Sequence, residues 1–402
     1  MARVYEGRLD SLAGVSTRVA IKVIHPEHAN DQAFQELFIT EARISARLEH
    51  QNLVRVQQFN REGDLYYLVM ELIDGITLRK MISLCRRHQI QLPVSVIAEV
   101  GRQVCEGLEY AHGLRNDANE AMQLVHRDIK PSNLMLTNQG VVKVLDFGIS
   151  YSRGTEIGTG VKGTWGYMAL EQIEGRRVGP PADVYGLAAV LFELATLEPL
   201  FDEKDNNRIR ERMVEDEAAR RAAGIGGQYA ELGAVLVRGL QRDPAARFNN
   251  CASFGRALAR LITNPVTIRD DLIQLGQNFR GLDENNPGAV DRVRSITTVP
   301  SQVDPRTGSA LGLPVATGTV HGPIMVPPED RPKKEDRAAP SWVSFVAGGA
   351  LMSAVASGVA VVVVLQINKP DPDPVPTEPT TEAAVKAPPA PAPTEVAPPD
   401  GA

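Results

Sequence analysis

The sequence contains little cysteine, few aromatic residues and no excess of positive charge. Its three cysteines show neither C-x-x-C spacing nor paired histidine spacing, so we interpret them as reduced cytosolic thiols without a metal role. The net charge of −6 gives no reason to expect a nucleic-acid partner. The N-terminus carries no apolar secretory segment. With 402 residues, the chain is long enough for two or three domains and a sizeable core.

One polar stretch organises the chain. It is His126-Arg127-Asp128-Ile129-Lys130-Pro131-Ser132-Asn133, and Asp146-Phe147-Gly148 follows thirteen residues after Asn133. H-R-D-x-K-x-x-N followed by D-F-G at this spacing resembles the protein kinase family. The resemblance covers about residues 1–262. It implies an α+β, bilobal fold with a small antiparallel β lobe plus one helix and a larger helical lobe. Chance polar residues on surface loops are the alternative, which the combined motifs disfavour.

The resemblance assigns a chemical role to this stretch. Asp128 would orient the substrate hydroxyl and accept its proton, and Lys130 would neutralise the moving phosphoryl group, as in the serine/threonine branch. Asn133 and Asp146 would hold Mg²⁺, or Mn²⁺ in its place, because hard cations prefer oxygen ligands. The implied cofactors are therefore ATP and Mg²⁺, and the implied partners are protein substrates. His126 is expected to have a structural role.

The nucleotide site is expected near the start of the chain. Residues 17–24 alternate and are rich in β-branched residues, which predicts a strand. Val19-Ala20-Ile21-Lys22 within it resembles the motif whose lysine grips the α- and β-phosphates. Taken alone, Lys22 would more often be a solvated strand end. Residues 31–49 have a helical period that places Glu41, nineteen residues after Lys22, to pair with it.

The adenine pocket is assigned by the same resemblance. Further strands are expected at residues 2–7 and 65–71, and another is expected to start within residues 50–54. Composition cannot separate pocket residues from ordinary core residues, because nucleotide pockets are themselves mostly apolar. The expected residues are Val4, Ala20, Met135 and Leu145 as apolar walls, Met70 as the gatekeeper, and Glu71, Leu72 and Ile73 as the hinge.

The helical lobe is expected from about residue 78. Apolar residues recur at three and four over 96–111, and residues 183–197 are apolar nearly all round, which suits a buried central helix. By resemblance, Asp183 would support the backbone of the catalytic loop, and Glu171 would pair with Arg247. Leu170 stands where the family has proline, and its presence is expected to loosen that turn.

The segment from Asp146 to Glu171 is expected to carry regulation. Thr159, and after it Thr155, are the candidate phosphorylation sites, although each could be an ordinary loop hydroxyl. Arg127 could pair with such a phosphate. Thr164 lies where the family uses a hydroxyl to bridge towards the catalytic residues.

The family's glycine-rich phosphate loop is incomplete here. Val4 matches the last valine of that loop and Ala2 falls where its third glycine would be, so the small lobe is expected to lack its first strand. One interpretation is a translation start placed too far downstream. The other is a truly shortened protein with an exposed sheet edge and impaired nucleotide binding.

The C-terminal third differs in composition. After an N-terminally truncated kinase domain at 1–264, a flexible cytoplasmic linker is expected at 265–340, with at most one peripheral helix at 265–280. Residues 341–367 predict a membrane-spanning helix, with a buried globular helix as the alternative. Small residues within it could let two copies pack as a homodimer. Residues 368–402 predict a proline-rich, disordered tail.

Charges set the predicted orientation. Arg331, Lys333, Lys334 and Arg337 precede the span and Lys369 alone follows it, which places the kinase domain inside the cell and the tail outside. The sequence thus predicts a single-pass serine/threonine kinase of the inner membrane, resembling bacterial receptor-like kinases. The alternatives are a catalytically weak pseudokinase scaffold and a small-molecule phosphotransferase.

Overall fold

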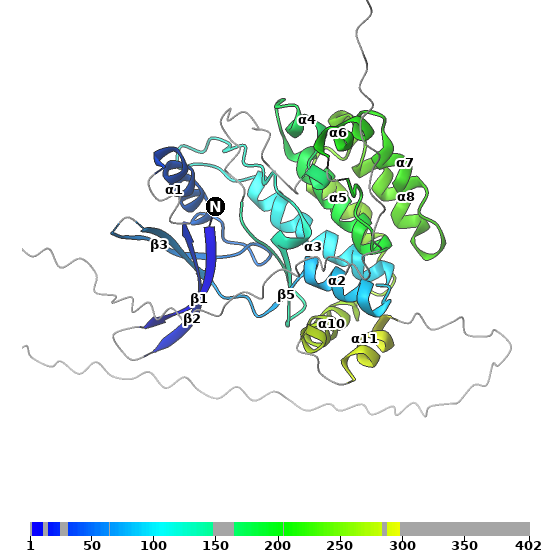
Figure 1. Cartoon of the computed structure of the whole chain (residues 1–402), viewed down its shortest axis with the longest axis horizontal. Helices are drawn as coiled ribbons and strands as arrows, with labels where there is room; N and C mark the ends of the chain where they lie inside the picture. Colours follow the sequence, from blue (N-terminus) through cyan, green and yellow to red (C-terminus); the bar gives the residue numbers. More distant parts are fainter. Residues whose placement is uncertain are drawn as a thin grey trace, which may run out of the picture. The chain divides into compact units, whose positions relative to one another are not determined.

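The computed structural model describes residues 2–10, 15–24, 31–63, 65–147, 165–203, 205–283 and 288–297. The first of these form an antiparallel sheet with one helix against it (Figure 1). Both strands and the helix predicted before residue 50 are confirmed. The elements are β1 (Ala2–Asp10), β2 (Ser16–Ile24), α1 (Gln32–Ser45), β3 (Val56–Glu62) and β4 (Leu65–Glu71), in the sheet order β1-β2-β4-β3.

The register of this sheet places Lys22 on the face that α1 covers. Val4 lies opposite Lys22 and Met70 lies opposite Ala20, so these four side chains share one face. Ala20 and Met70 pack with Phe38 of α1 in one apolar cluster. The alternation of β2 therefore directs its lysine towards the helix that carries Glu41. The opposite face carries a smaller cluster of Val19, Ile21 and Val69.

The strand predicted to start within residues 50–54 starts later, because this segment is held by the helical lobe instead. The Asn52 side chain donates to the carbonyl of Val142 at 2.9 Å, and Leu53 forms an isolated bridge with Val144. The strand β3 therefore begins only at Val56. This segment is one of the connections between the sheet and the helices.

The second part of the domain is mainly helical and includes a small three-stranded sheet. That sheet contains β5 (Gly75–Thr77), β6 (Leu134–Thr137) and β7 (Val142–Val144) in this spatial order. The helices are α2 (Leu78–His88), α3 (Val94–His112), α4 (Leu170–Ile173), α5 (Pro180–Thr196), α6 (Asn206–Val214), α7 (Glu217–Ala223), α8 (Ala230–Gly239) and α9 (Cys251–Ala259), with short 3₁₀ turns η2 (Pro131–Asn133), η4 (Trp165–Tyr167), η5 (Gly227–Tyr229) and η6 (Pro244–Ala246).

The helix α5 forms the centre of this part, as its nearly continuous apolar sequence predicts. Its residues from Ala182 to Ala195 are all buried, and it packs against α3, α8 and α9. Its polar buried members are Asp183 and Glu193, both of which accept hydrogen bonds. The core therefore fixes two carboxylates, of which Asp183 contacts the segment that carries Asp128.

Two further helices follow the predicted end of the kinase domain. Composition predicts a flexible linker from residue 265 with at most one peripheral helix at 265–280. A helix is found there, α10 (Ile268–Asp283), but it is buried in the core and not peripheral. A second packed helix, α11 (Ala289–Thr297), shows that the linker prediction is wrong for residues 289–297. Averaging the composition over the whole segment hides a short amphipathic pattern. Its apolar positions Leu272, Leu275 and Phe279 are completely buried in the main core.

No helix in the described ranges is long and apolar enough to cross a bilayer. The segment predicted to do so, residues 341–367, lies outside those ranges, together with residues 298–340 and the tail at 368–402.

Candidate active site

Lys22 joins the sheet, α1 and the segment after β7. Its Nζ contacts Glu41 Oε1 at 2.7 Å and Asp146 Oδ1 at 2.8 Å, as the sequence spacing predicts for the first pair. Burial opposes the charge on Lys22, but the two carboxylates outweigh it and raise the lysine pKa. Burial raises the pKa of Glu41, and Lys22 offsets this only in part. Two carboxylates share one ammonium here, so the site has excess negative charge and suits a cation.

Asp128 is held by two neighbours that leave one of its oxygens unused. Its Oδ2 accepts from Lys130 Nζ at 2.7 Å and from Asn133 Nδ2 at 2.9 Å. Its Oδ1 is buried and has no hydrogen-bond partner within the described part of the chain. A buried acceptor without a donor is unfavourable by roughly 1–3 kcal/mol. A substrate hydroxyl would supply that donor, which is the position that a general base requires.

The oxygen atoms near Asp128 and Asp146 fit a hard cation. The Asn133 amide nitrogen faces two acceptors, the carbonyl and Oδ2 of Asp128, both at 2.9 Å, so its oxygen points away from them. The backbone N–H of Leu145 donates to the Asn133 carbonyl at 2.8 Å, which brings the next residue, Asp146, near Asn133 in space. The Asp146 side chain is 41% exposed. An amide oxygen and a carboxylate are suitable Mg²⁺ ligands.

The backbone of the catalytic loop, His126–Asn133, is held by the carboxylate of Asp183 in α5, as the resemblance implies. Its two carboxylate oxygens accept the backbone N–H groups of His126 and Arg127, both at 2.8 Å. Arg127 has φ of 65° and Asp146 has φ of 44°, both in the left-handed region that side chains disfavour. Such a backbone persists where surrounding contacts hold it, and here the loop is held by a completely buried carboxylate.

His112 of α3 supplies the third contact of this carboxylate and was not predicted. Its Nε2 lies 2.7 Å from Asp183 Oδ2. Burial opposes the charged imidazole, but the contact with Asp183 prevails and raises the pKa of His112 to about 10. Burial opposes the charge on Asp183 as well, yet His112 and the loop amides keep its pKa below the ordinary value. Both pKa shifts favour the ionised forms of the pair.

His126 has the structural role that the sequence predicts. Its Nδ1 accepts the N–H of Asp128 at 3.2 Å and its Nε2 lies 2.8 Å from the carbonyl of Leu145. These partners require a neutral ring with its proton on Nε2. The ring also contacts that of Phe147, with centroids 4.7 Å apart. His126 thereby connects the catalytic loop to the segment that carries Asp146.

The predicted pair of Glu171 and Arg247 is present and deeply buried. Arg247 Nη1 and Nη2 contact the two Glu171 oxygens at 2.7 and 2.9 Å. The remaining donors of the guanidinium bind three carbonyls, so all five N–H groups are used. The guanidinium also lies 4.9 Å from the centre of the Tyr185 ring. The carbonyls belong to Gln241, Pro181 and Arg242.

Leu170 does not prevent a well-formed turn. It is the first residue of α4, where the backbone N–H has no partner inside the helix, so proline is favoured but not required. Its side chain is buried in the main core. Gln172 holds the turn by accepting the N–H of Ala169 at 3.1 Å and donating to the carbonyl of Arg127 at 2.8 Å. The predicted loosening is therefore not seen.

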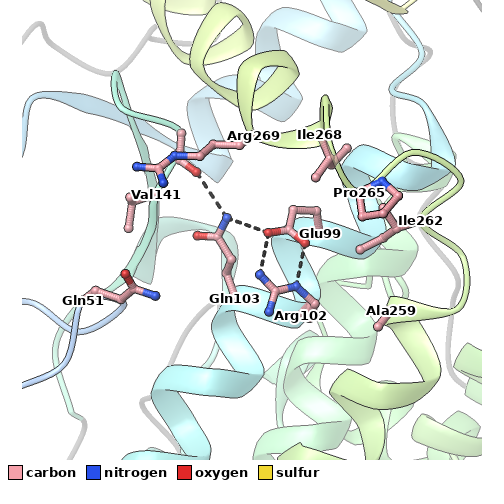
Figure 2. A pocket seen from close by; sticks show the side chains of 11 residues that line it. Gln51, Glu99, Arg102, Gln103, Val141, Ala259, Ile262, Pro265, Ile268 and Arg269 are labelled. Carbon is pink, nitrogen blue, oxygen red and sulfur yellow. Dashed lines mark hydrogen bonds and ion pairs between the residues drawn. The ribbon is translucent and has the colours of Figure 1, made fainter. Parts of the chain in front are cut away.

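Gln103 is a junction that the sequence analysis missed (Figure 2). Its Nε2 donates to Glu99 Oε1 at 3.0 Å and to the carbonyl of Gly140 at 3.2 Å. Its Oε1 accepts from the Val142 N–H at 2.8 Å and from Asn52 Nδ2 at 3.1 Å. One amide thus joins α3, the turn before β7 and the segment after α1. A cavity of about 410 Å³ borders this junction. A single glutamine on a helix gives no sequence signal for such contacts.

The residues expected to form the adenine pocket lie in β1, β2, β4 and β6 and in the segments after β4 and β7. Ala20 and Met70 are buried neighbours in the sheet, whereas Val4 is 59% exposed. Glu71 pairs with Lys143 at 2.6 Å through its side chain. Ile73, Met135 and Leu145 are half-buried.

The regulatory candidates Thr155, Thr159 and Thr164 lie outside the described residues. Arg127 is described, and its backbone contributes to the loop as given above. Phosphorylation of the threonines therefore stays a prediction from the sequence.

Comparison with known proteins agrees with this geometry. The protein kinase domain family matches residues 3–251. The tyrosine-protein kinase MasK of Myxococcus xanthus is 32% identical over 270 residues, which cover 66% of this chain and 42% of MasK. The serine/threonine-protein kinase PksC of Streptomyces coelicolor is 31% identical over 322 residues, which cover 77% of this chain and 53% of PksC.

A third relative gives the same result. The serine/threonine-protein kinase PknB of Mycobacterium tuberculosis is 32% identical over 252 residues, which cover 60% of this chain and 38% of PknB. The chain therefore spans about half or less of the length of these relatives. The family match and the arrangement of Lys22, Asp128 and Asp146 lead to one conclusion: the chain belongs to the protein kinase domain family.

Proposed function

We propose that the chain is a serine/threonine protein kinase that transfers the γ-phosphate of ATP to hydroxyl groups of proteins. The observation that carries this proposal is the Asp128 carboxylate, with Oδ2 bound by Lys130 and Asn133 and Oδ1 left as a buried acceptor. Phosphoryl transfer depends mainly on positioning and charge neutralisation, and this arrangement offers both.

The residues divide the work of transfer among them. Lys22, held by Glu41, would bind the α- and β-phosphates. Asp128 would orient the acceptor hydroxyl and receive its proton at Oδ1, as the hydroxyl oxygen bonds to the γ-phosphorus and the bond to the β-phosphate oxygen breaks. Lys130 would neutralise charge on the phosphoryl group. Mg²⁺, when held by Asn133 and Asp146, would neutralise charge between the phosphates.

Two observations bear on the acceptor. Lys130 lies two residues after Asp128, as in the serine/threonine branch, and two of the three relatives are named serine/threonine kinases. MasK is named a tyrosine kinase, so tyrosine is the competing acceptor. The scaffold alternative is not favoured, because Lys22 is paired with both Glu41 and Asp146.

The test is phosphate transfer from radiolabelled ATP with Mg²⁺ to a generic protein such as casein. We expect label on serine or threonine after acid hydrolysis, and none with a Lys22→Met variant, which removes the phosphate-binding ammonium. Label mainly on tyrosine would overturn the proposal that serine and threonine are the acceptor residues. If the unmodified chain binds nucleotide but transfers no phosphate, the proposed kinase activity is overturned and the pseudokinase scaffold is favoured.

We further propose that residues 341–367 anchor the kinase to the inner membrane of a bacterial cell. The support is the uncharged apolar run from Trp342 to Ile367 and the basic residues before it. Alkaline phosphatase fused after Ala402 should be active outside the cytoplasm, whereas the same fusion after Thr297 should be inactive. Activity of both fusions, or of neither, would contradict the span or its direction.

A further inference from the structure

We propose that α10 and α11, together called the hinge brace, position the hinge for nucleotide binding. The brace comprises Ile268–Asp283 and Ala289–Thr297, and it lies beyond residues 3–251 that the kinase family matches. The inference rests on the proposed kinase function and adds residues outside the family's own domain to it. Figure 1 shows the brace beside β5 and α2, and these elements are in contact.

The brace is part of the folded core and not an appended segment. Leu272, Leu275 and Phe279 of α10 have no exposed surface, and neither do Ala289 and Val293 of α11. All five belong to the main apolar cluster of the helical part. Such complete burial excludes water from the surface of α10 that faces the kinase domain. The position of α10 is therefore set by the same packing that sets β5 and β6.

The brace contacts the chain immediately after the hinge. Arg280 of α10 forms an ion pair with Asp74, which directly follows the hinge residues Glu71–Ile73. The neighbouring pair of Lys80 and Asp283 has an N–O distance of 2.7 Å. The carbonyl of Asp74 also accepts the N–H of Asn138 at 3.0 Å. The segment after the hinge is thus held between β6 and α10.

The backbones of α10 and β6 approach one another closely. A Cβ atom on Gly276 would lie 2.6 Å from the carbonyl oxygen of Thr137, so glycine is required for this contact. The strand β6 begins directly after Asn133 and contains Met135, the candidate adenine wall. The helix α10 therefore supports both sides of the expected adenine site, the hinge through Asp74 and the floor through β6.

A matched pair of leucine variants tests this role. Leu275 of α10 and Leu236 of α8 are both leucines without exposed surface, and Leu236 lies in a helix that does not adjoin the hinge. We expect Leu275→Ala to raise the dissociation constant for ADP with Mg²⁺ and the KM for ATP about fivefold or more, with kcat at saturating ATP within about twofold. Leu236→Ala should lose comparable stability and leave both nucleotide constants unchanged.

Calorimetric titration with ADP and Mg²⁺ gives the dissociation constant and the binding-competent fraction together, so partial unfolding is separated from weaker binding. A surface variant, Arg280→Glu, guards against failure of Leu275→Ala to fold. It should weaken ADP binding about two- to fourfold, and adding Asp74→Arg should restore it. Arg242→Glu, which removes an exposed ion pair with Asp216, is its control.

The outcomes separate the two proposals. Equal nucleotide constants in Leu275→Ala and Leu236→Ala, with no effect of Arg280→Glu, would overturn the brace. If the unmodified chain binds ADP but transfers no phosphate, the kinase function is overturned. The role of the brace can still be tested in that case, because it is measured by the dissociation constant for ADP. A chain that binds no nucleotide would overturn both.

Discussion

Asp128→Asn is expected to lower kcat by about 10²- to 10⁴-fold, the usual contribution of a general base. An amide oxygen at the Oδ2 position would still accept hydrogen bonds from Lys130 and Asn133, which lie at 2.7 and 2.9 Å. The amide nitrogen would then replace Oδ1, the oxygen that has no partner among the described residues. A donor would face the substrate hydroxyl where the native enzyme presents an acceptor.

The measurement is initial rate against ATP and protein substrate, with ADP titration to confirm that nucleotide binding is kept. Asp117→Asn is the matched control, because the Asp117 side chain is 93% exposed and lies in a surface turn. Its kcat should equal that of the unmodified chain. Turnover of Asp128→Asn within about threefold of the native rate would mean that another group accepts the proton.

Arg247→Ala is expected to lower the free energy of unfolding by about 3–5 kcal/mol, because it leaves the Glu171 carboxylate buried without its partner. Glu171 is 2% exposed, so water cannot replace the guanidinium. Three backbone carbonyls lose their donors as well. For a domain of this size the melting temperature should fall by roughly 10 °C.

Thermal unfolding followed by circular dichroism measures this change. The control is Arg242→Ala, whose ion pair with Asp216 is about half exposed on both sides and should matter by less than about 1 kcal/mol. The melting temperature of Arg247→Lys should lie between those of Arg247→Ala and Arg242→Ala, since an ammonium cannot form both parallel hydrogen bonds. Similar melting temperatures for Arg247→Ala and Arg242→Ala would show that the buried pair adds little.

Motif spacing made the charged centre of the site predictable. The distance in sequence between Lys22 and Glu41 fits a strand followed by a helix, and their ion pair is found. Asp183 and the pair of Glu171 and Arg247 also occupy the predicted roles. These residues are recognisable because their chemistry restricts which residue types can stand at each position.

The supporting contacts were not predictable in the same way. Asn52, Gln103 and Val142 lie far apart in sequence and meet only when the lobes are assembled. His112 is the last residue of α3, a helix whose buried positions are mostly apolar, so its contact with Asp183 has no local pattern. Neutral amides and a helix histidine occur in many structural settings, and only the fold distinguishes them.

The helix expected at 265–280 is present as α10, but its burial in the core and the second helix α11 were not predicted. Leu272, Leu275 and Phe279 recur at helical spacing and are all buried. The following residues are rich in glycine and proline, and they dominate an average over the whole segment. A shorter window over residues 268–283 would have predicted that this helix faces the core and is not peripheral.

The left-handed backbones of Arg127 and Asp146 set stability against catalysis at two positions. Glycine adopts a φ of 65° or 44° without the steric cost that other residues bear, so glycine at either site would relieve the main chain. It would also remove the side chain that the site needs, above all the carboxylate at Asp146. Selection for heat resistance alone would therefore favour glycine at these two positions and lower activity. Selection for turnover would keep the native residues and their strained backbone.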